Sequence, residues 1–149
     1  EKIEKLFTQS SDVILKSKQL SQKINDSIKL IITSLERKNK ILIFGNGGSA
    51  ADAQHMSAEF ISKYLLERLS LPAIALTTDT SILTSIGNDY NFNKIFSRQC
   101  ESLVDKGDVV IAISTSGSSQ NVILGIEEAK RKGAKIIKRE RTIHCKTST

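Results

Sequence analysis

The sequence has few of the residues that define several large classes of protein. Its 149 residues include two cysteines, one proline and no tryptophan. Cys100 and Cys145 lie far apart and form no Cys-x-x-Cys pair, which argues against a disulfide framework and against a thiolate zinc site. No apolar run approaches the roughly 20 residues that a membrane span needs, and the polar N-terminus does not resemble a signal peptide. We therefore expect one cytoplasmic domain, residues 1–149, with no membrane partner.

The positive charge of the chain does not indicate a nucleic-acid partner. The formal net charge is +6, and half of this excess comes from residues 138–149. Elsewhere lysines alternate with acidic residues, as on a solvated surface, and the aromatic content of 5% offers few platforms for stacking bases. We expect no binding of nucleic acid.

The first 38 residues have the pattern of a long helical arm. Apolar residues recur every three or four positions from Ile3 to Leu35, with an interruption near residues 17–21. An arm placed before the first strand has one sheet face to cover, so its other apolar side is expected to meet a second subunit. Burial of both sides within one chain is the alternative.

From Lys40 onwards the pattern predicts an α/β fold with a parallel sheet and crossover helices, in a flavodoxin-like arrangement of three layers. Helix-like stretches alternate with apolar runs in this core, which extends to about residue 137. The predicted strands are residues 41–44, 73–76, 109–113 and 135–137, and the predicted helices are about 49–65, 93–104 and 119–132. The first run is apolar throughout, which is typical of a strand covered on both faces.

Two turns rich in glycine and serine, residues 45–49 and 114–119, each follow a predicted strand and precede a predicted helix. Free backbone N–H groups and a helix N-terminus can converge there on a phosphate, and the hydroxyl groups add further hydrogen bonds. Glycines that only allow a strand and a helix to approach closely are the alternative. The first turn lacks the third glycine of a dinucleotide fingerprint, and the chain has no Gly-Lys-Ser or Gly-Lys-Thr, so we expect no nucleotide cofactor.

His55 and Glu59 lie four residues apart in the helix predicted after the first turn, so their side chains share one face. Three interpretations fit this spacing: a surface hydrogen-bonded pair, half of a zinc site, or a glutamate that moves a proton between adjacent carbons of a sugar phosphate. The spacing does not choose among them.

Several motifs occur in the order found in the phosphoheptose isomerases, a branch of the sugar isomerase (SIS) domain proteins, and the chain resembles that family from about residue 1 to residue 137. The motifs are Gly-Asn-Gly-Gly-Ser at 45–49, Ala-Asp-Ala-Gln-His at 51–55 with Ala-Glu at 58–59, Thr-Thr-Asp at 77–79, Gly-Asn-Asp at 87–89, Phe-Ser-Arg-Gln at 96–99 and Ile-Ser-Thr-Ser-Gly at 113–117.

The resemblance implies an enzyme that converts sedoheptulose 7-phosphate to glycero-manno-heptose 7-phosphate, for lipopolysaccharide or capsule. It also implies a cytoplasmic homotetramer. By matching position, Glu59 would be the catalytic residue and would also bind substrate, and His55 with Glu59 would be metal ligands in members that hold one zinc per subunit. The remaining residues implied to bind substrate are Asn46, Gly47, Gly48, Ser49, Asn88, Asp89, Ser114, Thr115, Ser116 and Ser119.

The sequence departs from this family at two places. Lys63 stands where the family has an arginine, which keeps the charge but loses a forked donor. From Lys138 the tail bears no relation to the family, whose later helix carries a second acid/base histidine and a glutamine, and we do not expect His144 to replace that histidine. We therefore expect isomerase activity to be weak or absent in this chain.

Two other functions remain open. One is a module without catalytic activity that binds a partner protein such as a replication initiator, and the other is a sensor that binds a sugar phosphate without turning it over.

Overall fold

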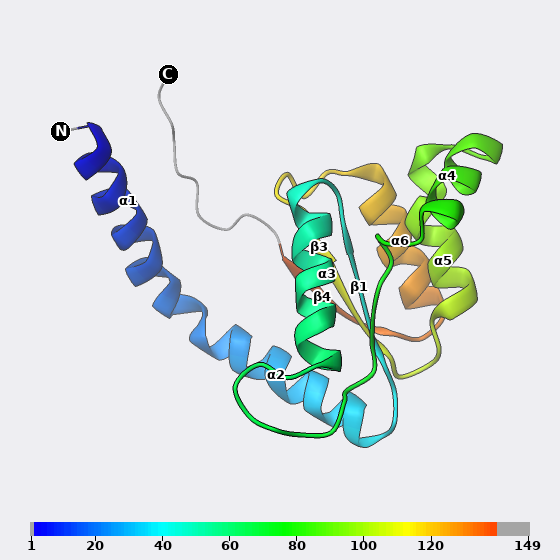
Figure 1. Ribbon diagram of the computed structural model, residues 1–149, viewed down its shortest axis with the longest axis horizontal. Coiled ribbons are helices and arrows are strands. Elements are labelled where there is room, and N and C mark those ends of the chain that lie inside the picture. Colours follow the sequence, from blue (N-terminus) through cyan, green and yellow to red (C-terminus); the bar gives the residue numbers. More distant parts are fainter. Residues whose placement is uncertain (1, 140–149) are drawn as a thin grey trace.

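The computed structural model describes residues 2–139 and contains one parallel sheet with helices on both faces (Figure 1). The strand order is β2-β1-β3-β4, and every neighbouring pair is parallel. The strands are β1 (Ile41–Gly45), β2 (Ala73–Ala75), β3 (Val109–Ile113) and β4 (Lys135–Arg139). The predicted three-layer α/β fold is therefore confirmed, and β4 runs two residues beyond the predicted strand.

Most of the helices lie where the sequence predicts them. They are α1 (Lys2–Lys16), η1 (Ser17–Leu20), α2 (Ser21–Glu36), α3 (Gly48–Ile61), α4 (Thr80–Asp89), η2 (Phe92–Lys94), α5 (Ile95–Leu103) and α6 (Gln120–Arg131). The break in the arm near residues 17–21 is confirmed as η1, a short 3-10 helix. Helix α4 was not predicted, and α3 ends four residues sooner than predicted. His144 and Cys145 lie outside the described residues.

The sheet has an apolar cluster on each face. One cluster joins alternate strand residues such as Phe44 and Val110 to helices α5 and α6, where the Phe44 and Phe96 rings stack 4.8 Å apart. The other joins residues such as Ile43 and Ile111 to helices α2 and α3. Strands β1 and β3 are buried along their whole length, as continuous apolar runs predict for central strands.

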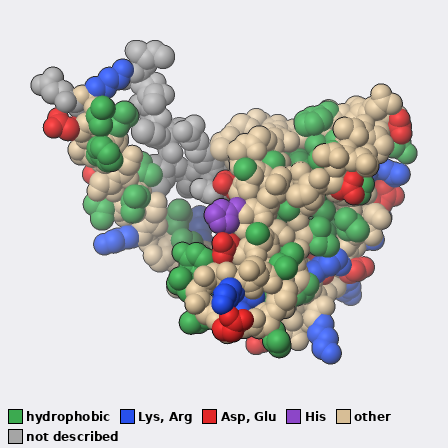
Figure 2. All heavy atoms as spheres, viewed as in Figure 1, with side chains coloured by type: hydrophobic (Ala, Val, Ile, Leu, Met, Phe, Trp, Pro, Cys, Tyr) green, Lys and Arg blue, Asp and Glu red, His purple; other side chains and the backbone are tan. Residues whose placement is uncertain are grey.

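Helix α1 of the arm extends away from the sheet (Figure 1), and hydrophobic side chains gather along the arm (Figure 2). Helix α1 has no buried residue. Large apolar side chains that are at least half exposed on the arm are Ile3, Leu6, Phe7, Ile14, Leu15, Ile24 and Ile32. Among residues 2–139, no helix is both long and apolar enough to cross a bilayer.

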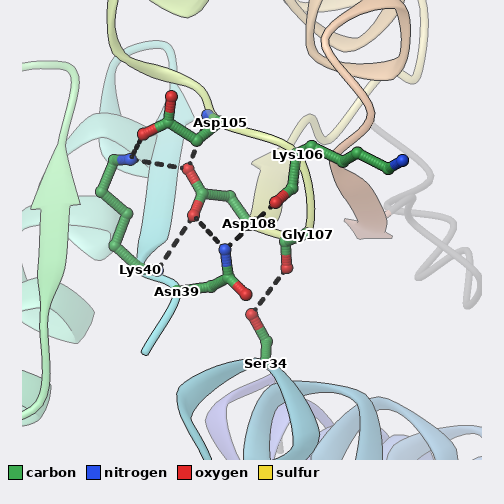
Figure 3. Close-up of polar contacts among 7 residues, drawn as sticks. All are labelled: Ser34, Asn39, Lys40, Asp105, Lys106, Gly107 and Asp108. Carbon is green, nitrogen blue, oxygen red and sulfur yellow. Dashed lines mark hydrogen bonds and ion pairs between the residues drawn. The ribbon is translucent and has the colours of Figure 1, made fainter. Parts of the chain in front are cut away.

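A polar network joins the arm to the edge of the sheet where β1 and β3 begin (Figure 3). Asp108 is fully buried, and its carboxylate accepts hydrogen bonds from the backbone N–H groups of Lys40, at 3.0 Å, and Asp105, at 2.8 Å. The ammonium group of Lys40 lies 2.8 Å from the same carboxylate and 2.7 Å from that of Asp105. The hydroxyl of Ser34, in α2, donates to the carbonyl of Gly107 at 2.8 Å, which fixes the end of the arm against β3.

Candidate functional site

The two turns rich in glycine and serine lie side by side at the carboxyl ends of β1 and β3. These strands are neighbours although β2 lies between them in sequence, and Gly45 pairs with Ile113. The connections from β1 and β3 therefore leave in opposite directions along the sheet, which is the arrangement that opens a ligand crevice in parallel α/β folds. A Cβ at position 45 would lie 2.6 Å from the carbonyl oxygen of Ile113, so only glycine allows this approach.

The first turn leads directly into α3. Gly47 has φ of 55°, a conformation that favours glycine, and Gly48 is the first residue of the helix. Asn46 is half-buried, Gly47 and Gly48 are exposed, and Ser49 is buried. The turn thus has no side chain at two successive positions, Gly47 and Gly48. A ligand in the crevice can therefore come close to the backbone of the turn.

Three serine hydroxyls of the second turn form a triangle. The Oγ atoms of Ser114 and Ser116 are 3.5 Å apart, those of Ser114 and Ser119 are 3.4 Å apart, and those of Ser116 and Ser119 are 3.5 Å apart. Ser114 and Ser116 also accept hydrogen bonds from the backbone N–H groups of Gly117 and Ser118. Three hydroxyls that can each donate a hydrogen bond therefore lie close together, at a spacing that suits the oxygens of one anion.

This triangle stands at the N-terminus of α6, which is 12 residues long. Within residues 2–139, the backbone N–H groups of Gln120 and Asn121 have no hydrogen-bond acceptor, whereas those of Val122 and Ile123 bind the carbonyl of Ser119. Two free N–H groups and the positive end of the helix dipole therefore lie directly beside Ser119, one of the three serines. A phosphate group is the ligand that this combination favours.

An amide pair that the sequence analysis missed connects the two turns. The side chain of Asn46 exchanges two hydrogen bonds with that of Asn121, at 2.9 and 2.8 Å. Asn121 is 3% exposed and shares the buried face of α6 with Val122, Gly125 and Ala129. A polar residue on that otherwise apolar face is the signal that could have identified it.

His55 and Glu59 form a pair on α3, with 3.3 Å between His55 Nε2 and Glu59 Oε1. The His55 side chain is exposed, and that of Glu59 is 38% exposed. The second carboxylate oxygen, Oε2, is buried and has no hydrogen-bond partner among the described residues, which is unusual for a native carboxylate. Over residues 2–139 no group of three or more His, Cys, Asp or Glu side chains is placed to hold a metal ion, so this pair supplies at most two ligands.

Glu59 and the serine triangle do not meet within one chain. Glu59 lies eleven residues beyond Gly48 on α3, which at about 1.5 Å per residue is roughly 16 Å from the start of the helix. The guanidinium of Arg68 donates to the carbonyls of Glu59 and Phe60, at 2.6 and 2.9 Å. These bonds satisfy two carbonyls in the last turn of α3, and Lys63 lies beyond the helix in an ion pair with Glu67.

The other residues implied to bind substrate lie at the edges of this region. Asn88 and Asp89 are exposed at the end of α4, where the Asn88 amide donates to the Asp89 carboxylate at 2.9 Å. Thr115 is exposed between Ser114 and Ser116. Among the described residues, no hydrogen bond joins Asn88 or Asp89 to either turn, so one chain gathers only part of the predicted site.

Comparisons with known proteins identify relatives over most of the chain. A family model described as SIS domain matches residues 7–138. The chain is 54% identical over 138 residues to the phosphoheptose isomerase of Aquifex aeolicus and covers 72% of it. It is 56% identical over 119 residues to that of Citrifermentans bemidjiense, of which it covers 62%. The matched regions thus span 72% and 62% of these two relatives, which are each about a third longer than this chain.

Solved structures agree with the sequence relatives. A phosphoheptose isomerase from Neisseria gonorrhoeae superposes with a TM-score of 0.87 at 40% identity, over 94% of this chain and 73% of the other. One from Francisella tularensis superposes with a TM-score of 0.84 at 32% identity, over 94% of this chain and 75% of the other. Both likenesses cover the arm and the sheet together.

Proposed function

We propose, from the premise that this chain belongs to the SIS domain family and within it to the phosphoheptose isomerases, that it interconverts sedoheptulose 7-phosphate and glycero-manno-heptose 7-phosphate. The relatives carry the name of this enzyme, and none of the comparisons favours the partner-binding alternative. The substrate is a heptose phosphate, and the two turns at the carboxyl ends of β1 and β3 are its binding site.

The observation that carries this proposal is the serine triangle at the N-terminus of α6. The three hydroxyls lie within 3.5 Å of one another beside the two free backbone N–H groups. A phosphate anchored there orients the open-chain sugar and lowers the entropic part of the barrier to the reaction at the other end of the molecule. Ser49, Ser114, Thr115, Ser116 and Ser119 would hold the phosphate end.

The reaction requires a base beside the first two carbons of the sugar. Removal of a proton alpha to a carbonyl gives an enediolate. Return of the proton to the neighbouring carbon, together with transfer of a hydroxyl proton from one of the two oxygens to the other, completes the isomerisation. Glu59 is our candidate for this base because one of its oxygens is buried without a partner. Asn46, Gly47, Gly48, Asn88 and Asp89 would contact the hydroxyl groups of the sugar and the developing oxyanion.

A second copy of the chain would bring a Glu59 carboxylate to the first two carbons of a sugar whose phosphate is held at the serine triangle. A second group of exposed apolar side chains follows α3, in addition to those of the arm. Its members, each at least 74% exposed, are Tyr64, Leu65, Leu66 and Leu69. An apolar surface of this extent favours association. We propose a homo-oligomer, a tetramer as the family resemblance implies, in which α3 of one subunit faces the turns of another.

His55 and Glu59 would hold one zinc ion per subunit, with the remaining ligands supplied from outside the described residues. The exposed imidazole and the unpartnered Glu59 oxygen fit such an ion. When bound, zinc would polarise the carbonyl group of the sugar. We further propose that the protein acts in the cytoplasm and supplies heptose for lipopolysaccharide or capsule.

Titration calorimetry with sedoheptulose 7-phosphate tests the binding site. Ser116→Ala should weaken binding about tenfold, because it removes one hydroxyl from the triangle. Ser118→Ala is the matched control, since that exposed serine lies in the same turn and contributes no hydroxyl to the triangle. Glu59→Gln should retain binding and abolish the remaining turnover, which we expect to be weak in this chain because residues from Lys138 onward bear no relation to the family. Failure of the wild-type protein to bind the sugar phosphate would overturn the proposal.

A further inference from the structure

Asn121 is a buried polar residue that takes part in no step proposed so far. It is the second residue of α6 and is 3% exposed. Its amide forms a closed pair with that of Asn46: Asn46 Nδ2 donates to Asn121 Oδ1 at 2.9 Å, and Asn121 Nδ2 donates to Asn46 Oδ1 at 2.8 Å. The pair joins two segments that lie 75 residues apart in sequence.

A third hydrogen bond fixes the orientation of this pair. The backbone N–H of Val122 donates to Asn121 Oδ1 at 2.9 Å. That N–H also donates to the carbonyl of Ser119, at 3.0 Å, so a flipped Asn121 would not leave it without an acceptor. The flip would still place the Asn121 NH2 group against the Val122 N–H, two donors with no acceptor between them. The bond from Val122 therefore favours the orientation in which the NH2 group of Asn46 faces Asn121 Oδ1 and the oxygen of Asn46 faces Asn121 Nδ2.

We propose that Asn121 is a positioning residue for the turn that contacts the sugar, acting through Asn46. This inference rests on the proposed function, because it takes Asn46 as a contact to the sugar. An amide offers two N–H donors and two acceptor positions, and the pair uses one of each on Asn46. The remaining donor and acceptor of Asn46 therefore face the crevice in a fixed order, which selects hydroxyl groups of matching geometry and excludes the flipped arrangement.

The variant Asn121→Asp tests this role, because an ionised aspartate can accept hydrogen bonds and cannot donate one. One of its oxygens can still accept from Val122 and from Asn46, but the other would face the oxygen of Asn46. When the new carboxyl group is protonated, its O–H can donate to that oxygen and restore the pair. Binding of the sugar phosphate, relative to wild type at the same pH, should therefore be weakest at neutral pH and recover as the pH falls.

At pH 7.5 we expect Asn121→Asp to bind sedoheptulose 7-phosphate at least about tenfold more weakly than the wild type. Inorganic phosphate serves as the second ligand, since the serine triangle alone would bind it. The ratio of the two affinities isolates the contribution of the sugar from the effect of a new charge near α6. Asn93→Asp, at an exposed position in η2, is the control for the same chemical change.

The neutral variant Asn121→Leu removes the pair without adding a charge. It should lower the same affinity ratio at every pH, and it keeps the test decisive if Asn121→Asp does not fold. Nuclear magnetic resonance reads the pair directly: in the wild type one side-chain N–H proton each of Asn46 and Asn121 should exchange slowly, and that of Asn46 should exchange rapidly in Asn121→Leu.

The outcomes separate this inference from the proposed function. If the wild type binds neither ligand, the proposed function and the ligand-facing role both fail, while the amide signals still show whether Asn121 orders Asn46. If the wild type binds the sugar phosphate, the positioning role is overturned by an unchanged affinity ratio in both variants, or by a ratio in Asn121→Asp that does not respond to pH. A purely structural role would move stability and leave that ratio unchanged.

Discussion

Replacing Asp108 with asparagine should destabilise the protein strongly, although the change alters a single atom. Each oxygen of the buried carboxylate accepts two hydrogen bonds. One takes the backbone N–H of Lys40 at 3.0 Å and the amide of Asn39 at 3.4 Å. The other takes the backbone N–H of Asp105 at 2.8 Å and the ammonium group of Lys40 at 2.8 Å. Asparagine must turn its NH2 group toward one of these pairs of donors.

The magnitude follows from the donors left without an acceptor. If the NH2 group faces the side of Asp105, the ammonium of Lys40 can turn to the Asp105 carboxylate and to solvent, but the part-buried backbone N–H of Asp105 loses its acceptor. An orphaned buried donor costs about 1–3 kcal/mol, and the loss of charge from the remaining hydrogen bonds adds to this. We expect a total loss of about 2–4 kcal/mol, a large part of the 5–15 kcal/mol that is typical of a domain.

Urea unfolding followed by far-UV circular dichroism measures this loss, with all variants at one protein concentration because association shifts the midpoint. Asp105→Asn is the matched control. It removes the other partner of Lys40, but the Asp105 side chain is 76% exposed, so the change in stability should be much smaller. Equal midpoints for the two variants would refute the assignment of Asp108 as the centre of the network.

Three further predictions follow from packing and titration. Gly45→Ala should cost about 2 kcal/mol or more in thermal unfolding, whereas Gly48→Ala, with open space around its Cβ, should be neutral or stabilising; the reverse order would contradict the close approach at Gly45. Burial raises the pKa of the Cys100 thiol to about 12, so peptide mass spectrometry should find it unmodified by iodoacetamide at pH 8 until urea is added. The hydrogen bond from Lys40 holds the pKa of Asp105 below its ordinary value, so this stabilisation is present at neutral pH and lost as the pH falls through the lowered value. Wild type should therefore lose more stability than Asp105→Asn between roughly pH 5 and pH 2, and parallel curves would contradict this.

The sequence predicted those parts of the fold that local patterns determine. Strands β1 and β3 are continuous apolar runs, and they are the central, fully buried strands. Helix α4 was missed because most of its residues are polar or small, although Asp79 caps it by accepting from the N–H of Ile82 at 2.9 Å. The end of α3 was placed too late, and the contact that satisfies the carbonyl of Glu59 in its last turn comes from Arg68, nine residues further along the chain.

In the candidate site, too, the sequence predicted local features and missed contacts between residues that are distant along the chain. Glycine and serine in a short stretch are a local signal, and both turns were predicted. The pairing of Asn46 with Asn121 depends on the strand order, which brings two distant segments together at the crevice. The separation of Glu59 from the serine triangle depends on the length of α3 in three dimensions, which a spacing of residues along the chain does not reveal.

Helix α1 has a thermodynamic consequence of its own. It contains 15 residues, none of them buried, and a helix of that length is marginal in water when nothing packs against it. Its free energy of formation must then come from whatever covers its apolar side. If a second copy of the chain packs against that side, dilution should unfold α1 while leaving the sheet intact. The helical content of the protein would then measure the fraction of chains that are associated.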